Sequence, residues 1–215
     1  MLEDLSAGFI ELKRDEVTET VTTWIERGDD PLEILEQARR AMTAVGDRFQ
    51  EGTLFLAEMM LAAEIFKGVV ALLQPLLDRI RPPEPIGRVV LATPKGDIHD
   101  LGKAIFGTLL EGQGFEVHDL GVDVEPLLVV ETVAEVKPDL VGFSALITSA
   151  FASMKQAAEL LEKQNLRDSL KLMVGGGVTS PAVKEHVGAD FQSTDAMEGV
   201  AYCLRIVEKE RSHAR

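Results

Sequence analysis

Apolar side chains in residues 1–80 recur at the three- and four-residue spacing of α-helices, without the alternation typical of β-strands. The clearest helix start lies at residues 30–33. Asp30 suits the N-cap, Pro31 suits the first turn, and Glu33 follows three residues after the aspartate. The apolar positions that follow share one helical face: Leu35, Ala38, Met42, Val45 and Phe49.

A break at residues 51–53 separates this helix from a second apolar pattern. Its members are also predicted to share one face: Phe55, Met59, Ala62, Phe66, Val69 and Leu73. Two shorter helices are predicted upstream, one over residues 5–12 and one marked by Val17, Val21 and Trp24. Together these patterns predict a four-helix bundle in the N-terminal part of the chain.

A proline-rich stretch at residues 81–87 cannot continue a helix and indicates a semi-rigid linker. We therefore place a domain boundary there, with a helical cap domain over residues 1–82 and a second domain over residues 88–215.

Beyond the linker, short apolar runs alternate with helical patterns. The predicted strands cover residues 88–93, 115–119, 140–144, 170–174 and 189–192. The predicted helices cover residues 102–111, 125–136, 149–163, 181–186 and 196–209. Strands joined by crossover helices form parallel sheets, so this part is predicted to be α/β, with a doubly wound five-stranded sheet of the Rossmann or flavodoxin type.

Composition narrows the classes of function. Lys and Arg number 22 against 36 acidic residues, a net charge of -14, which argues against nucleic acid and against an anionic membrane surface as partners. The single cysteine, Cys203, excludes an internal disulfide and is expected in the core. Without a signal-like start or a run of about 20 apolar residues, we expect a cytoplasmic protein.

Candidate chemistry is concentrated between the first predicted strand and the helix after it. Asp97 and His99 fall in this loop, at the carboxyl end of a strand, where α/β sheets bind ligands. A carboxylate beside a histidine can take one ring N–H and leave the other nitrogen for a metal ion. A His–Asp pair taken alone is more often an ordinary loop contact than part of a metal site.

Two further motifs end other predicted strands at the same edge of the sheet. The three are Asp97-x-His99-x-x-Gly102, Ser144-x-Leu146 and Gly175-Gly176, with 41 residues between Gly102 and Ser144 and 28 between Leu146 and Gly175. This set resembles the cobalamin-binding signature. Residues 46–60 in turn resemble the helical cap of cobalamin-dependent methionine synthase and of the corrinoid proteins of one-carbon methyltransferase systems. The resemblance covers nearly the whole chain.

The resemblance implies a role for each matched residue. His99 would be the lower axial ligand of cobalt, with Asp97 accepting its other N–H. The residues that would surround the cofactor and its nucleotide tail are Gly96, Ile98, Asp100, Gly102, Ser144, Leu146, Thr148, Gly175, Gly176 and Ala196. Phe49 and Leu56 would shield the upper, methyl-bearing face, whereas we expect Met59 to be core.

One departure from methionine synthase concerns proton transfer. A serine that extends the His–Asp relay in that enzyme is replaced here by Ala150, with Ser149 beside it. The relay beyond Asp97 is therefore in doubt, although ligation by His99 does not depend on it.

The resemblance also implies a function, that of a non-catalytic corrinoid carrier subunit. Bound cobalamin would accept a methyl group from a substrate-specific methyltransferase, forming methylcobalamin. A second methyltransferase would then deliver the group to a thiol or tetrahydrofolate, and a reductive activator is a further partner to consider. The alternatives are the cobalamin-binding subunit of a radical mutase and a cobalamin-dependent sensor. The helical cap argues against the mutase and the chain length against the sensor, while the methyl donor is not identified.

Overall fold

The computed structural model describes residues 4–77 and 84–213. Contacts within the chain define two compact units, one holding the N-terminal helices and the other holding the sheet. Residues 81–83 of the predicted linker lie outside the described part of the chain.

The helical unit contains α1 (Ser6–Ile10), α2 (Arg14–Arg27), α3 (Pro31–Gln50) and α4 (Leu56–Leu77). The predicted start of α3 is confirmed, because the Asp30 side chain accepts a hydrogen bond from the Leu32 N–H at 2.9 Å and Pro31 occupies the first helical position. The side chain of Trp24 is buried on α2, as its apolar spacing predicted.

The prediction that Phe55 shares the apolar face of α4 is wrong. Phe55 precedes the helix and its side chain is 74% exposed, while its N–H donates to the Glu58 carboxylate at 2.7 Å. As the residue outside the first turn, it does not follow the rotation of the helix. The buried face begins with Met59, whose predicted place in the core is confirmed.

The α/β unit is built on a five-stranded parallel sheet, which confirms the predicted fold class. The strands are β1 (Arg88–Ala92), β2 (Glu116–Asp119), β3 (Leu140–Ser144), β4 (Lys171–Gly175) and β5 (Phe191–Ser193). Their order across the sheet is β2-β1-β3-β4-β5. Central strands covered on both faces are continuously apolar. Accordingly, Val89, Val90 and Leu140 are fully buried.

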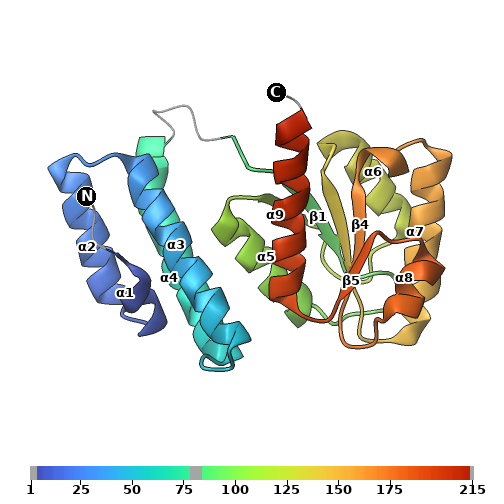
Figure 1. Cartoon of the computed structure of the whole chain (residues 1–215), viewed down its shortest axis with the longest axis horizontal. Helices are drawn as coiled ribbons and strands as arrows, with labels where there is room; N and C mark the ends of the chain where they lie inside the picture. The colour runs from blue at the N-terminus through green and yellow to red at the C-terminus, as the bar shows by residue number, and fades with distance from the viewer. Residues whose placement is uncertain (1–3, 78–83, 214–215) are drawn as a thin grey trace. The chain divides into compact units, whose positions relative to one another are not determined.

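Helices cover both faces of this sheet (Figure 1). They are α5 (Leu101–Gln113), α6 (Pro126–Val136), α7 (Phe151–Lys163), α8 (Pro181–Val187) and α9 (Ala196–His213). Figure 1 shows α5 and α9 on one side and α6, α7 and α8 on the other. Buried side chains of α6 and α7, such as Val130 and Met154, form one core cluster with β1, β3 and β4. In the described part of the chain, no helix is long and apolar enough to span a membrane.

Small shifts separate the predicted elements from the observed ones. The last strand lies at Phe191–Ser193 rather than at residues 189–192, and a 3-10 turn at Thr148–Ala150 precedes α7. The expected core position of Cys203 is confirmed, because its side chain is fully buried on α9. Burial raises the pKa of this thiol to about 12, so it stays protonated at neutral pH.

Candidate functional site

The candidate site lies at the carboxyl edge of the sheet. The chain leaves β1 toward β2 on one side and, after α6, returns to β3 on the other side of β1. Loops after β1 and β3 therefore diverge at a topological switch point, which is where open α/β sheets bind ligands. The Asp97–His99 loop follows β1 and Ser144 ends β3, so two of the three motifs flank this point.

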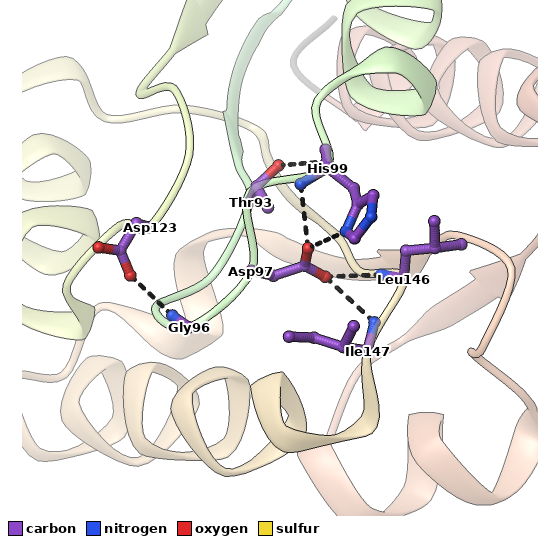
Figure 2. A network of polar contacts seen from close by, with 7 residues as sticks. All are labelled: Thr93, Gly96, Asp97, His99, Asp123, Leu146 and Ile147. Carbon is purple, nitrogen blue, oxygen red and sulfur yellow. Dashed lines mark hydrogen bonds and ion pairs between the residues drawn. The ribbon is translucent and has the colours of Figure 1, made fainter.

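Asp97 is the centre of the polar network at this edge (Figure 2). Its side chain is fully buried. One carboxylate oxygen accepts hydrogen bonds from the His99 N–H at 3.0 Å and from His99 Nδ1 at 2.7 Å. The other accepts from the N–H groups of Leu146 at 2.7 Å and Ile147 at 3.2 Å. One buried carboxylate thus joins the loop after β1 to the loop after β3.

These hydrogen bonds decide the ionisation of Asp97. Burial by itself would raise the pKa of the carboxyl group. The N–H groups of Leu146, His99 and Ile147, together with the His99 ring, outweigh burial and lower the pKa below its usual value of 3.8. Asp97 is therefore an ionised acceptor at neutral pH.

The state of Asp97 fixes the tautomer of His99. An ionised carboxylate can only accept hydrogen bonds, so Nδ1 of the ring carries the proton that faces it. Among the described residues, Nε2 has no hydrogen-bond partner, and the side chain is 51% exposed. The ring is thus held on one side and presents a free nitrogen lone pair on the other, as a metal ligand must.

The three motifs meet at this edge of the sheet, and the closest backbone approach is between Gly176 and Ala145. A Cβ on Gly102 would lie 3.8 Å from the Ser144 hydroxyl oxygen. At Gly176, where φ is +99°, a Cβ would lie 2.1 Å from the Ala145 carbonyl oxygen. Any side chain there would force the two loops apart, so glycine is required for both its conformation and its size. Gly175 completes the contact, because its carbonyl oxygen accepts from the Ala145 N–H at 3.0 Å.

The other predicted site residues occupy different surroundings. Gly96 has a φ of +90°, while Ile98, Asp100 and Thr148 are exposed. Ala196 is the first residue of α9, directly after β5. Phe49 and Leu56 are half-buried in the helical unit, near the end of α3 and at the start of α4. A cofactor contact by each of these residues remains a prediction.

The side chains available as metal ligands indicate which kind of metal site this edge of the sheet can form. Within the described residues, no group of three or more His, Cys, Asp or Glu side chains could hold a bare ion. A lone imidazole therefore suits a metal whose remaining ligands belong to a cofactor. Ile98, Leu101 and Leu146 expose 72%, 48% and 47% of their surface, so apolar side chains are available at this edge for an apolar macrocycle.

The second carboxylate oxygen of Asp97 is the atom from which a proton relay beyond this residue would extend. Its second oxygen binds two backbone N–H groups, and no contact described for this carboxylate involves a hydroxyl. Ala150, at the position where methionine synthase has its serine, is fully buried. An N–H group of the backbone holds a carboxylate in place without passing protons on.

Comparison with known proteins agrees with this arrangement. Residues 87–201 match the model of a B12 binding domain, and residues 1–74 match a second model described as a B12 binding domain. The chain belongs to the B12-binding family. It is 39% identical over 203 residues to the dimethylamine corrinoid protein of Methanosarcina barkeri, covering 94% of each chain. The predicted relationship to corrinoid proteins and the predicted cofactor, cobalamin, are thereby confirmed.

Two solved structures share the fold of this chain. A cobalamin-binding protein from Desulfitobacterium hafniense aligns with a TM-score of 0.78 at 36% identity, covering 96% of this chain and 98% of that one. The methanol:cobalamin methyltransferase complex of Methanosarcina barkeri aligns with a TM-score of 0.87 at 24% identity, covering 96% of this chain and 79% of the matched chain. At that identity, the second match supports the fold alone.

Sequence reasoning missed three residues that contact the Asp97–His99 loop of this B12-binding domain. The buried Thr93 hydroxyl donates to the His99 carbonyl at 3.1 Å, and Asp123 accepts from the Gly96 N–H at 2.8 Å. Ile147 donates through its backbone, which leaves no signature in the sequence. Asp123 could have been noticed as a carboxylate soon after the second predicted strand.

Asp97→Asn tests the electrostatic account in the cofactor-free protein. The folded-state pKa of Asp97 lies below the unfolded value of 3.8, so its contribution to stability is complete above that pH and is lost as the pH falls through the folded-state pKa. We expect the variant to lose about 2 kcal/mol at pH 7, the scale of hydrogen bonds to a charged group. Urea unfolding at descending pH should show this difference shrinking below pH 3.8.

The exposed Asp168 provides a matched control, since Asp168→Asn should change stability little at either pH. A difference between wild type and Asp97→Asn that stayed constant from pH 7 to pH 2.5 would contradict the account.

Proposed function

We propose that this chain is a corrinoid methyl carrier, a subunit that exchanges methyl groups between partner methyltransferases through bound cobalamin. The observation that supports this function most is the Asp97–His99 pair, with Nδ1 held by a buried carboxylate and Nε2 free at a half-exposed position. The family relationship supplies the cofactor, and the name of the dimethylamine corrinoid protein supplies the methylamine context.

Different residues of the chain would have different roles in binding the cofactor. His99 would ligate cobalt through Nε2, and Asp97 would fix the ring by accepting the Nδ1 proton. Gly175 and Gly176 would let a large group lie against backbone rather than side chains. When bound, cobalamin in its cobalt(I) form supplies the nucleophile that takes up a methyl group and later releases it.

The proposed role of methyl carrier implies three partner proteins. A substrate-specific methyltransferase would donate the methyl group, a second methyltransferase would deliver it to a thiol or tetrahydrofolate, and a reductive activator would restore oxidised cobalt. The dimethylamine corrinoid protein at 39% identity favours a methylamine as the donor.

His99→Ala tests the ligand assignment. Wild-type protein loaded with cobalamin should show, in the EPR spectrum of the cobalt(II) form, the nitrogen hyperfine pattern of a protein imidazole. The variant should lose that pattern, because the free Nε2 is removed. Asp97→Asn should keep the ligand but weaken cobalamin binding by roughly 10–100-fold, as loss of a supporting partner typically does. An unchanged pattern in His99→Ala would show that the ligand is another group.

Reconstitution tests the carrier function and the donor together. The cobalamin-loaded chain, reduced to cobalt(I), would be mixed with methyltransferases for dimethylamine, trimethylamine and methanol, each with its substrate. We expect the absorbance change of cobalt methylation with a methylamine enzyme, and none with His99→Ala at the same cobalamin loading. Failure with all three enzymes would reject the proposed donors, and activity in a carbon-skeleton rearrangement assay would favour the mutase alternative.

We also propose that Phe49 and Leu56 contact the cofactor. Both are half-buried, and the connection between α3 and α4 brings the two helix ends together, with the Gly52 N–H donating to the Phe49 carbonyl at 3.0 Å.

Phe49→Ala combined with Leu56→Ala should leave the circular dichroism spectrum and cobalamin binding intact. Photolysis of bound methylcobalamin should quicken, because a methyl radical is less well confined. Met59→Ala, a core change, should lower stability instead, by about 2–5 kcal/mol. An unchanged photolysis rate in the folded double variant would reject the contact.

A further inference from the structure

The connection between β2 and α6 is bound along its length to the loop that carries His99. At its start, Asp119 pairs with Lys103 in the first turn of α5, where the lysine side chain is only 3% exposed, and accepts from the Gly121 N–H at 2.8 Å. At its end, Glu125 pairs with Lys95. Both ends of this connection are therefore tied to the segment that leads from β1 into α5.

Backbone hydrogen bonds fill the interval between these ion pairs. The Thr93 N–H donates to the Gly121 carbonyl at 3.0 Å, the Val124 N–H to the Thr93 carbonyl at 3.0 Å, and the Lys95 N–H to the Val124 carbonyl at 2.9 Å. Pro94 and Val124 form an isolated parallel bridge. The pairing of β1 with β2 thus continues past the ends of both strands, up to the residue before Gly96.

Beyond the end of this strand pairing, Asp123 continues the hydrogen bonding to the loop that carries His99. Its carboxylate accepts from the Gly96 N–H at 2.8 Å, and its own N–H donates to the Asp97 carbonyl at 2.9 Å (Figure 2 shows the first contact). Asp123 also has a φ of 54°, the left-handed conformation that Asp, Asn and Gly tolerate best. One exposed residue therefore holds the backbone on both sides of the Gly96–Asp97 peptide bond.

We propose that Asp123 is a positioning residue for the axial ligand His99. It acts through Asp97, since the backbone that Asp123 holds determines where the Asp97 carboxylate meets Nδ1 of the ring. The role rests on the proposed function, in which His99 binds cobalt. The β2–α6 connection lies outside the three motifs, and it supplies a specific side chain to the ligand loop.

Two variants separate the loss of the carboxylate from the backbone strain. Asp123→Gly removes the acceptor and suits the left-handed conformation, whereas Asp123→Asn keeps an acceptor oxygen and tolerates the same φ. Asp139→Ala is the matched control: its carboxylate accepts from the Arg88 N–H at 2.6 Å, at the opposite end of β1. If Asp123→Gly fails to fold, Asp123→Ala removes the same acceptor in both measurements, and its free energy of unfolding is measured as well because alanine is strained at this φ.

Hydrogen exchange in cobalamin-free protein measures the positioning directly. In Asp123→Gly, we expect the Gly96 and His99 amides to exchange about 10-fold faster or more, because a hydrogen bond to a charged group is lost. Asp123→Asn should stay within about 3-fold of wild type, since a neutral acceptor forms a weaker but intact bond. Asp139→Ala should leave exchange in this loop unchanged. Unchanged exchange in Asp123→Gly would overturn the proposal.

Loaded protein provides the second measurement. Asp123→Gly should bind cobalamin about 10–100-fold more weakly and show a reduced imidazole hyperfine pattern in the cobalt(II) EPR spectrum, with Asp123→Asn near wild type. Faster amide exchange in Asp123→Gly, with unchanged cobalamin binding and an unchanged EPR spectrum, would overturn the proposal. Asp123 would then stabilise the loop without positioning His99. A wild-type spectrum without protein imidazole would overturn the assignment of His99 itself, so the two failures are distinguishable.

Discussion

The buried carboxylate of Asp97 is the constraint on which the site depends. A charge removed from water is stable in a protein only when hydrogen bonds replace its hydration. Asp97 obtains four, from His99 twice and from Leu146 and Ile147 once each. These donors come from loops after two neighbouring strands, so the carboxylate is satisfied only when the β1 and β3 loops stand at their observed separation.

Close packing of backbone against backbone preserves that separation. Gly176 lies so near Ala145 that a methyl group would overlap the carbonyl oxygen, and the loop after β4 therefore supports the loop after β3. His99 lies in the loop after β1, with one ring nitrogen bound and one free. The protein holds the His99 ring through one nitrogen and exposes the apolar side chains of Ile98 and Leu146 at the same edge, which would suit the proposed cofactor with its own metal ligands.

Local patterns predicted much of this architecture because they depend on near neighbours in the chain. The N-cap at Asp30, the burial of Met59 and the strand at residues 140–144 all follow from spacing within a few residues. Errors occurred where an element ends: Phe55 has the apolar character of the α4 face but acts as the residue before the helix. The Asp97–His99 contact was predictable for the same reason, since two residues of one loop form it.

The sequence by itself therefore determined the helical N-terminal part and the α/β part that follows it, the order of the strands along the chain, and the pairing of His99 with the Asp97 carboxylate. Only the tertiary structure decided what holds that carboxylate. Leu146 is 49 positions from Asp97, and Asp123 is 27 positions from Gly96. The physical reason is that these contacts use backbone N–H groups, which nearly every residue possesses. The pattern of side chains in the sequence cannot predict hydrogen bonds from backbone N–H groups. These hydrogen bonds form only when the folded sheet brings its loops together.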